Sequence, residues 1–536
     1  ARRETAWPPA RLVRRASDPL VRLGLVSAPN RKRRPSAGNL AAGSSAAARS
    51  RVREYVDERL DCLPGTWRVE GAEKSDERAT KLIESADSLM SAVDLEYRHK
   101  PSWWAAVNVF QILFFLVFLV GALWLVPLAG AAPIMSRDVY SYLMQGTLLR
   151  DGLNAYTQGP ARNPNQILFE VSHDWRNTTT PYGPLHLWLG EAVTTVFGDN
   201  VTAGVYAFKA LAVAGFVAIM WFVPKIAQHL GADPAFALWL GVANPVMVFH
   251  LVGGMHNEAM MVGLVTVGLY LVVRQVAYPA VLGGFFAGVA LIAVAMALKA
   301  SAALCLPFVV WLVVNRAGES VGAKVRAFLL AGVGGAVETV AILAVITWAS
   351  GTTWEWIAAL AGNTKVVNPL SFPSLVSGVI GEAGRIGNPQ FPFNDVMVVA
   401  RAVSLVIMAV GFVACWWFLR RKPIMGAMWA YLIVFSFNAV TLPWYYASVL
   451  PLVGVVNCSR RINQFFIIGS IVVALAFTGS GNHQLYNPMW MGILAVSGWV
   501  ASRWLFAETT LVAYRRPGLE GHRLGAAHHL PGQVSV

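Results

Sequence analysis

The sequence is poor in charged residues and in cysteine. Only 13% of its 536 residues are charged, 56% are hydrophobic, and the mean hydropathy is +0.52. Because this much apolar surface must face lipid, the composition argues against a soluble domain. The four cysteines, Cys62, Cys305, Cys415 and Cys458, show no paired spacing. Their placement therefore argues against a disulfide framework and against a cysteine metal site.

Negative charge is scarce as well, since 29 acidic residues face 43 basic ones and leave a net charge of +14. A basic balance can indicate nucleic acid binding, but much of the excess lies in the first 34 residues. Several further basic residues occur at alternate junctions between apolar segments, as in the cytoplasmic loops of membrane proteins. These are Lys225, Arg274, 316–326, 420–422, 460–461 and Arg503. We therefore expect membrane lipids, and no nucleic acid, among the partners.

Apolar stretches long enough to cross a hydrocarbon core of about 30 Å recur along the chain. They predict an all-α polytopic membrane protein with about twelve transmembrane helices. The expected helices lie near 104–128, 203–223, 234–251, 258–273, 280–298, 301–315, 327–349, 395–419, 424–440, 446–457, 464–479 and 488–505. An even number of spans places both termini on the same side of the cell membrane, and the charged tails indicate that this side is the cytoplasm.

Three regions follow from this topology. Residues 1–100 are basic and of low complexity, and we expect them to be cytoplasmic and largely disordered. Residues 101–506 form the multi-pass region, with exoplasmic loops at 130–202 and 350–394, and residues 507–536 form a cytoplasmic tail. Within the first loop, 139–149 and 185–197 are expected to form amphipathic helices that rest on the membrane surface.

Polar and aromatic residues gather at the exoplasmic side, whereas the cytoplasmic loops carry mainly Lys and Arg. Carboxylates and amides bond sugar hydroxyls, and flat rings cover the apolar faces of sugars. The pattern therefore indicates a carbohydrate site on the outer face. The candidate substrate-binding residues are Arg137, Tyr140, Tyr142, Asn154, Tyr156, His173, Asp174, Arg176, Tyr182, Lys209, His256, Asn257, Glu258, Lys299, Trp444 and Tyr445.

Asp138 is the candidate catalytic residue, because it lies where the first outer loop leaves the membrane. There its carboxylate can reach both a lipid-borne phosphosugar and an acceptor hydroxyl, and can act as the base for that hydroxyl. A polyprenyl phosphate is a good leaving group, so the departing phosphate needs cations more than it needs an acid. The alternative is that Asp138 only caps the helix that follows it.

The motifs around Asp138 resemble a known superfamily. Residues 136–142 (SRDVYSY), followed by 152–156 (GLNAY) and 180–185 (TPYGPL), resemble the first loop of the GT-C lipid-phosphate-sugar glycosyltransferases, whose catalytic Asp occupies this loop. With 253–258 (GGMHNE), the chain is similar to the actinobacterial polyprenol-phosphate-mannose-dependent α-(1→6)-mannosyltransferases of lipomannan and lipoarabinomannan synthesis. The resemblance implies a GT-C fold, a polyprenyl-phosphate-mannose donor and a lipid-linked α-mannan acceptor.

The cation that binds the donor phosphate stays open at this point. Lys209 and Lys299 lie within or beside predicted helices, where an unpaired charge costs about 2.5–3.5 kcal/mol at mid-bilayer. A cavity that admits the phosphate would remove that cost. Arg137 and Arg176 lie nearer the surface and can serve equally. For each of these residues, snorkelling or a structural ion pair is the alternative.

Other candidates also have a second interpretation. His256, Asn257 and Glu258 follow a Gly-Gly pair and either bind the sugar or the base, or merely end a helix. Trp444 and Tyr445 either stack on the substrate or anchor the chain at the membrane interface. The sequence identifies no certain cofactor. A divalent metal requirement stays open, because the neighbouring His173 and Asp174 match no strong ligand signature.

A secondary transporter or lipid flippase is the alternative from another class, since its helices would carry similar intramembrane charges. Transporters tend to have short loops and polar residues near the midplane, whereas here the loops are long and the polar residues gather on one side. Within the enzyme class, a pentosyl, glucosyl or protein-O-mannosyl transferase is the alternative, because no motif distinguishes epimeric hydroxyls.

Overall fold

A computed structural model describes residues 125–275, 280–362, 367–478 and 482–514, together with Leu119 and Leu123. For 361–362 and 504–514 only the backbone is described. The predictions made for residues 1–100, for most of the first span at 104–128, and for the tail beyond residue 514 lie outside these ranges.

The described residues form helices joined by turns, with an isolated bridge between Phe477 and His483 and no strand. Four helices are long and apolar enough to cross a membrane, and one bent pair of helices meets the same test as a broken span. These are α7 (Val201–Leu230), α10 (Ala280–Leu298), α12 (Val321–Ala349), α15 (Phe393–Phe418), and the pair α8 (Pro234–Gly241) and η4 (Val246–Gly253). The predicted class, an all-α membrane protein, is confirmed.

Several of the other apolar helices are too short to meet the same test for a membrane span. Shorter apolar helices occur at α9 (Glu258–Val273), at η5 (Ala300–Cys305) with α11 (Leu306–Val314), and at α16 (Pro423–Phe437). The helices that follow α16 are η7 (Pro443–Ser448), α17 (Leu450–Val455), α18 (Arg460–Leu475) and α19 (Pro488–Tyr514). Within the described ranges, the structure does not confirm a count of twelve.

The predicted span 234–251 is bent by 61° between α8 and η4, and η4 is a π-helix. Pro245 cannot donate a backbone hydrogen bond, and so it ends the ladder of α8. The Asn244 side chain replaces part of that ladder, because it donates to Leu240 O and accepts from Met247 N. Short π-helical segments often occur at functional sites.

Both large loops contain helices. The first holds α5 (Asp138–Arg150), η2 (Pro160–Arg162), η3 (Gln166–Phe169) and α6 (Pro184–Phe197), and the second holds α13 (Trp356–Gly362) and α14 (Phe372–Gly387). The two helices expected in the first loop are therefore present as α5 and α6. Most of α5 is buried, so the expectation that it rests on the membrane surface is wrong. The reason is tight packing on α6, where a Cβ added to Gly146 would meet the Gly190 backbone at 2.2 Å.

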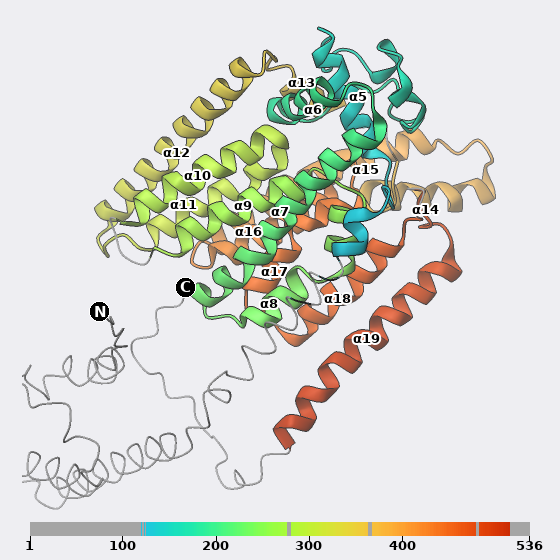
Figure 1. Ribbon diagram of the computed structural model, residues 1–536. Coiled ribbons are helices and arrows are strands. Elements are labelled where there is room, and N and C mark those ends of the chain that lie inside the picture. The colour runs from blue at the N-terminus through green and yellow to red at the C-terminus, as the bar shows by residue number, and fades with distance from the viewer. Residues whose placement is uncertain are drawn as a thin grey trace, which may run out of the picture. The chain divides into compact units, whose positions relative to one another are not determined.

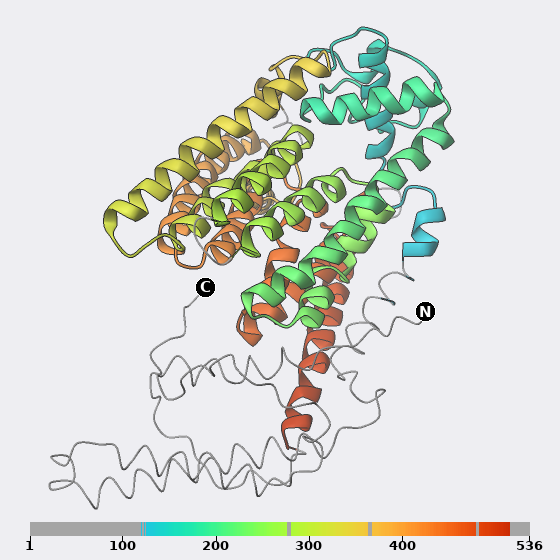
Figure 2. The same cartoon turned by 60° about the vertical axis from the view of Figure 1, so that its left-hand side comes forward.

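The longer helices pack side by side in the order α7, α9, α10 and α12, and α15 packs on α16 (Figure 1). In both views, α5 and α6 lie together at one end of these helices, next to the start of α7 (Figures 1 and 2). The first residue of α5 is Asp138, the candidate catalytic residue.

Candidate active site

A cavity of about 390 Å³ lies between α5, the first loop, η5 and the segment from α16 to η7. Its polar and aromatic lining consists of Asp138, Ser141, Tyr142, Gln145, Trp175, Thr178, Thr179, Tyr182, Lys299, Ser301, Asn438, Trp444 and Tyr445. Its apolar lining includes Leu304, Leu360, Met408, Val434, Phe435, Val440 and Leu442. Of the candidate residues named from the sequence, six line this cavity: Asp138, Tyr142, Tyr182, Lys299, Trp444 and Tyr445.

Asp138 is the first residue of α5, and its side chain is not a helix cap. The N-cap position belongs to Arg137, which makes no side-chain capping bond, and the Ser136 hydroxyl accepts a hydrogen bond from the Asp138 N–H. The Asp138 residue is 8% exposed and lines the cavity. The helix-cap alternative is therefore not what the geometry shows.

The pKa of the Asp138 carboxyl is raised to about 7. Burial is the main cause, because it disfavours the charged form, and the nearby charge of Glu258 raises the pKa further. Lys299 and hydrogen bonds with Ser136 and Trp175 oppose the shift. A carboxylate whose pKa lies near neutrality is suited to accept a proton during a reaction.

Lys299 lies directly after α10 and also faces the cavity. Its ammonium forms an ion pair with the buried Glu258, and it lies 4.3 Å from the ring centre of Tyr445 and 5.4 Å from that of Tyr182. Burial is the largest single influence and lowers the lysine pKa, but the charge of Glu258, its hydrogen bond with Lys299 and the charges of Tyr445 and Asp138 together outweigh burial, so the pKa is raised and the group stays protonated. Among the cations that the structure describes, Lys299 is the one that lines the cavity.

The segment 131–137, which precedes Asp138, lies against the end of η4, which is followed by the turn 254–257 before α9. Lys209 of α7 is buried and donates to Leu128 O at 2.9 Å and to Val252 O at 3.1 Å. The backbone of Ile134 donates to Gly253 O at 3.1 Å. Lys209, a candidate phosphate ligand, is thus engaged with two backbone carbonyls, and it connects the helical residue Leu128 to the end of η4.

The segment 131–137 and the turn 254–257 each contain a methionine in a left-handed backbone conformation. The φ angle is 61° at Met135 and 54° at Met255. Such a conformation in a residue other than glycine costs of order 1–3 kcal/mol and persists where the surrounding structure enforces it. The strain lies three residues before Asp138 and one residue before His256.

His256 and Asn257 lie behind the cavity wall and do not line it. The His256 ring is fully buried and stacks on Trp444, with ring centres 3.4 Å apart and an interplanar angle of 15°. Its Nδ1 lies 3.5 Å from Asp138 Oδ2. Asn257 Nδ2 lies 3.4 Å from Nδ1 of His186. These residues therefore support the lining side chains and do not contact the space where a substrate would bind.

The 180–185 motif positions an aromatic part of the lining. Gly183 N donates to Leu298 O at 3.2 Å, and a Cβ at Gly183 would meet Ala297 O at 2.3 Å, so this close approach requires glycine. The approach places Tyr182 next to Lys299. The Tyr182 ring contacts Tyr142 edge to face, with 5.4 Å between ring centres.

Several other candidates lie away from the cavity because they have partners of their own. Arg137 pairs with Glu170 at 2.9 Å, and both side chains are exposed. His173 pairs with Asp174 at 2.9 Å on the surface. Arg176 donates to two backbone carbonyls of the first loop. Tyr140 is only partly buried, and the Arg137 guanidinium lies 5.9 Å from its ring centre.

The 152–156 motif joins the two large loops. Asn154 Nδ2 donates to the Glu355 carboxylate at 2.6 Å. Tyr156 belongs to a small buried cluster with Leu148, Leu187 and Trp356. This motif therefore fixes one loop to the other and lies outside the cavity lining.

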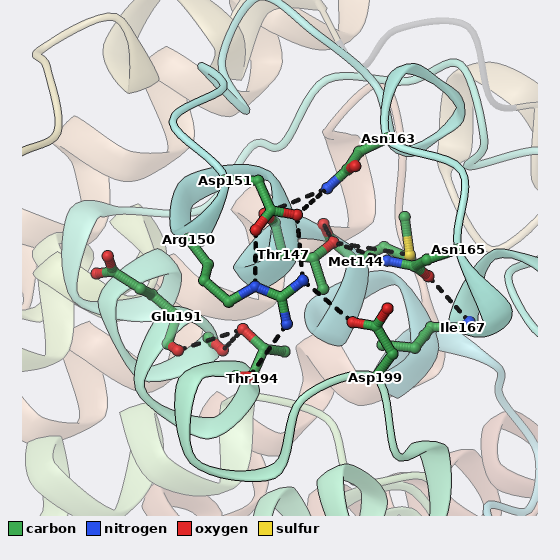
Figure 3. A network of polar contacts seen from close by, with 11 residues as sticks. Met144, Thr147, Arg150, Asp151, Asn163, Asn165, Ile167, Glu191, Thr194 and Asp199 are labelled. Atoms are coloured by element: carbon green, nitrogen blue, oxygen red, sulfur yellow. Dashed lines mark hydrogen bonds and ion pairs between the residues drawn. The ribbon is translucent and has the colours of Figure 1, made fainter.

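A polar network holds the first loop in shape (Figure 3). Arg150, the last residue of α5, pairs with Asp151 at 2.8 Å and with Asp199 at 3.1 Å, and donates to Thr194 O. Asn163 donates to Asp151 Oδ2 at 2.7 Å. The side chains in this network pair with one another within the first loop, which indicates a structural role.

Some residues that line the cavity were not predicted from the sequence. Ser141 and Gln145 follow Asp138 at helical spacing, so the shared face of α5 was a signal that could have identified them. Trp175 lies in the first loop beside three candidates, but only the fold shows that it faces Asp138. Ser301 lies in η5 and Asn438 directly follows α16, and neither position carries a sequence signal of its own.

The arrangement combines a carboxyl group with a pKa of about 7, a buried lysine and a wall of aromatic rings in one cavity. It is chemically suited to remove a proton from a hydroxyl group beside a bound anion. Within the described ranges, no group of three or more His, Cys, Asp or Glu side chains is placed to hold a metal ion.

Comparisons with known proteins match both halves of the chain. Residues 101–315 match the family model for the N-terminal domain of α-(1→6)-mannopyranosyltransferase, and residues 373–507 match the model for the MptB C-terminal domain. The α-(1→6)-mannopyranosyltransferase A of Corynebacterium glutamicum is 51% identical over 72% of this chain and 80% of that protein. The enzyme of the same name from Mycobacterium tuberculosis is 37% identical over 74% of this chain and 75% of that protein. Among solved structures, ArnT from Cupriavidus metallidurans bound to undecaprenyl phosphate aligns at 16% identity with a TM-score of 0.43, over 76% of this chain and 73% of that one.

Proposed function

Because this chain belongs to the α-(1→6)-mannopyranosyltransferase family, we propose that it transfers mannose from polyprenyl-phosphate-mannose to a lipid-linked α-(1→6)-mannan. Family membership confirms the resemblance recognised from the first loop. It identifies the chain as a mannosyltransferase and argues against the transporter alternative. The donor, the acceptor and the side of the membrane are the proposed parts. We place the reaction on the exoplasmic face.

One observation carries the proposal, namely that Asp138 and Lys299 line the same cavity. In the proposed reaction, the ionised Asp138 takes the proton of the acceptor hydroxyl as that oxygen attacks the anomeric carbon. The bond from the anomeric carbon to the phosphate oxygen breaks, and the polyprenyl phosphate leaves with its negative charge beside Lys299. Attack on the face opposite the phosphate inverts the anomeric centre, so a β-linked donor gives an α-linked product.

The other lining residues have roles that agree with this chemistry. Tyr182, Trp444 and Tyr445 offer flat rings to the sugar, and Asn438 offers an amide to its hydroxyl groups. The apolar side chains of α15 and α16 in the lining supply a surface for the hydrocarbon chain of the donor. A donor that carries a sugar, a phosphate and a lipid would contact all three kinds of surface.

The test uses purified protein in lipid nanodiscs with labelled polyprenyl-phosphate-mannose and a short α-mannoside acceptor. Asp138→Asn keeps the size of the side chain but removes the base, so turnover should fall by about two to four orders of magnitude while donor binding survives. Transfer from GDP-mannose without lipid donor would contradict the proposal. Near-normal transfer by Asp138→Asn would place the base elsewhere.

The proposed orientation has its own test. Cysteines introduced between Gln158 and Thr179 should react with an impermeant reagent on intact cells, whereas cysteines at Lys324 or Arg421 should react only after permeabilisation. Labelling at Gln158 only from the cytoplasm would reverse the assignment. Mass analysis of the lipoglycans in a deletion strain would then identify the acceptor that is lost.

A further inference from the structure

His256 is buried against the proposed base without belonging to the cavity. It is 0% exposed, and its Nδ1 faces Asp138 Oδ2 at 3.5 Å. Neither ring nitrogen has a hydrogen-bond partner among the described residues. A buried polar group without a partner costs about 1–3 kcal/mol, and so its presence beside a reactive carboxylate requires an explanation.

Three contacts fix the orientation of this ring. One face stacks on Trp444 with ring centres 3.4 Å apart. The ring edge lies against Gly254, where an added Cβ would come within 3.0 Å of Cδ2 and 3.1 Å of Nε2. The backbone of Met255, with its φ of 54°, turns the chain so that the ring points back toward Asp138. The same turn is tied to the segment before Asp138 by Ile134 N and Gly253 O.

The charge state of His256 follows from its surroundings. Burial lowers its pKa well below the ordinary value, and the charges of His250 and Lys299 act in the same direction. The ring is therefore neutral and carries a single N–H. Because an ionised carboxylate can only accept hydrogen bonds, the tautomer with the hydrogen on Nδ1 is favoured over one that presents a lone pair to Asp138.

We propose that His256 is a positioning residue that holds one oxygen of the Asp138 carboxylate through Nδ1–H, so that the other oxygen faces the acceptor hydroxyl. The inference rests on the proposed role of Asp138 as the base. The proton of the acceptor goes to the free oxygen of Asp138, while the bond from Nδ1–H stays on the other. His256 thus neither gains nor loses a proton during transfer. The contact of 3.5 Å shortens when substrate is bound, as apo contacts of catalytic groups commonly do.

Two substitutions separate this role from packing. His256→Phe keeps a flat ring against Trp444 but removes the N–H, whereas His256→Asn removes the ring but keeps an amide N–H near the position of Nδ1. We expect His256→Phe to lower kcat by about 10- to 100-fold. This is the range of losses seen in metalloenzymes when a residue that hydrogen-bonds to a metal ligand and orients it is replaced. The KM for the donor should stay unchanged. His256→Asn should retain kcat within about threefold of the wild type.

The pH dependence of kcat provides a readout that packing would not move. Loss of a donor to the carboxylate raises its pKa, so the pH at half-maximal kcat should shift upward in His256→Phe and stay in place in His256→Asn. Lys299 and Glu258 are the other charged groups that influence Asp138, and both remain in these variants. His250→Phe is the matched control. Its ring lies 5.9 Å from that of Trp444 and its Nε2 faces Ala474 O, so it should lose stability without the pH shift.

The outcomes separate this inference from the proposed function. If Asp138→Asn is inactive while His256→Phe keeps wild-type kcat and pH dependence, the positioning role is wrong and the base stands. Equal losses of kcat in His256→Phe and His256→Asn would likewise overturn the positioning role, because packing alone would explain them. If Asp138→Asn transfers mannose normally, both the base and its positioning residue are wrong.

Discussion

Replacing Asp138 with Asn should stabilise the folded protein at pH 8 although it removes the proposed base. The folded-state pKa of this carboxyl is about 7, compared with 3.8 for the free side chain, and burial is the main cause. A carboxyl whose pKa is raised on folding contributes most to stability below pH ~4, and that contribution is lost as the pH rises through about 7. Asparagine does not ionise, so it avoids the loss.

The size of the effect follows from the two pKa values. With about 1.36 kcal/mol per pKa unit, ionisation of Asp138 costs the folded state roughly 1.5 kcal/mol at pH 5 and roughly 4 kcal/mol at pH 8. The stability of Asp138→Asn relative to wild type should therefore rise by about 2.5 kcal/mol between pH 5 and pH 8. Because the comparison is between two proteins at each pH, other titrating groups cancel.

The assay is unfolding of wild type and Asp138→Asn in one detergent, followed by tryptophan fluorescence at pH 5 and pH 8. We expect the variant to unfold at the higher temperature at pH 8 and the difference to narrow at pH 5. A variant that is less stable than wild type by the same amount at both pH values would refute the reasoning. It would mean that the carboxylate stabilises the start of α5 and that burial does not perturb its ionisation.

Further substitutions test the supporting structure. Glu258→Gln or Lys299→Met alone should lower the free energy of unfolding by about 3–5 kcal/mol, because each leaves a buried charge unpaired. The double variant should regain most of the unfolding temperature but no activity. Lys209→Met should lower the free energy of unfolding by about 1–3 kcal/mol and reduce turnover, because it leaves the carbonyls of Leu128 and Val252 unpaired. An unchanged unfolding temperature would contradict this role of Lys209. Gly183→Ala should lower both stability and activity, whereas Gly322→Ala, where a Cβ meets nothing within 4 Å, should do neither; equal behaviour of the two variants would refute the close approach.

The helical class and many helix positions were predictable because they depend on apolar length. The predicted segments 258–273 and 280–298 coincide with α9 and α10. The predicted segment 234–251 is as apolar as these, yet it divides into α8 and the π-helix η4. Hydropathy measures how much surface is apolar and not which carbonyl each N–H reaches, and so the sequence could not reveal the bend.

The candidate site was predictable in its residue types but not in its partners. Lys209 and Lys299 are both cations in or beside apolar helices, and the sequence does not distinguish them. In the structure one meets two backbone carbonyls, while the other meets Glu258 and the cavity. His256 likewise stood out as polar, but its place behind Asp138 depends on the packing of Trp444, 188 residues later in the chain.

The contacts of Lys209 with the carbonyls of Leu128 and Val252 have a consequence for biosynthesis. One carbonyl partner, at Leu128, precedes α7, whereas the other, at Val252, follows Lys209 by 43 residues. At about 5–20 residues per second, the second partner is made roughly 2–9 s after the lysine. During that interval α7 must enter the bilayer with its charge only half satisfied, and the apolar character of the helix, with a mean hydropathy of 2.0 over 18 of its residues, offsets this. The lysine gains its second partner only when the nascent chain has brought the end of η4 next to α7.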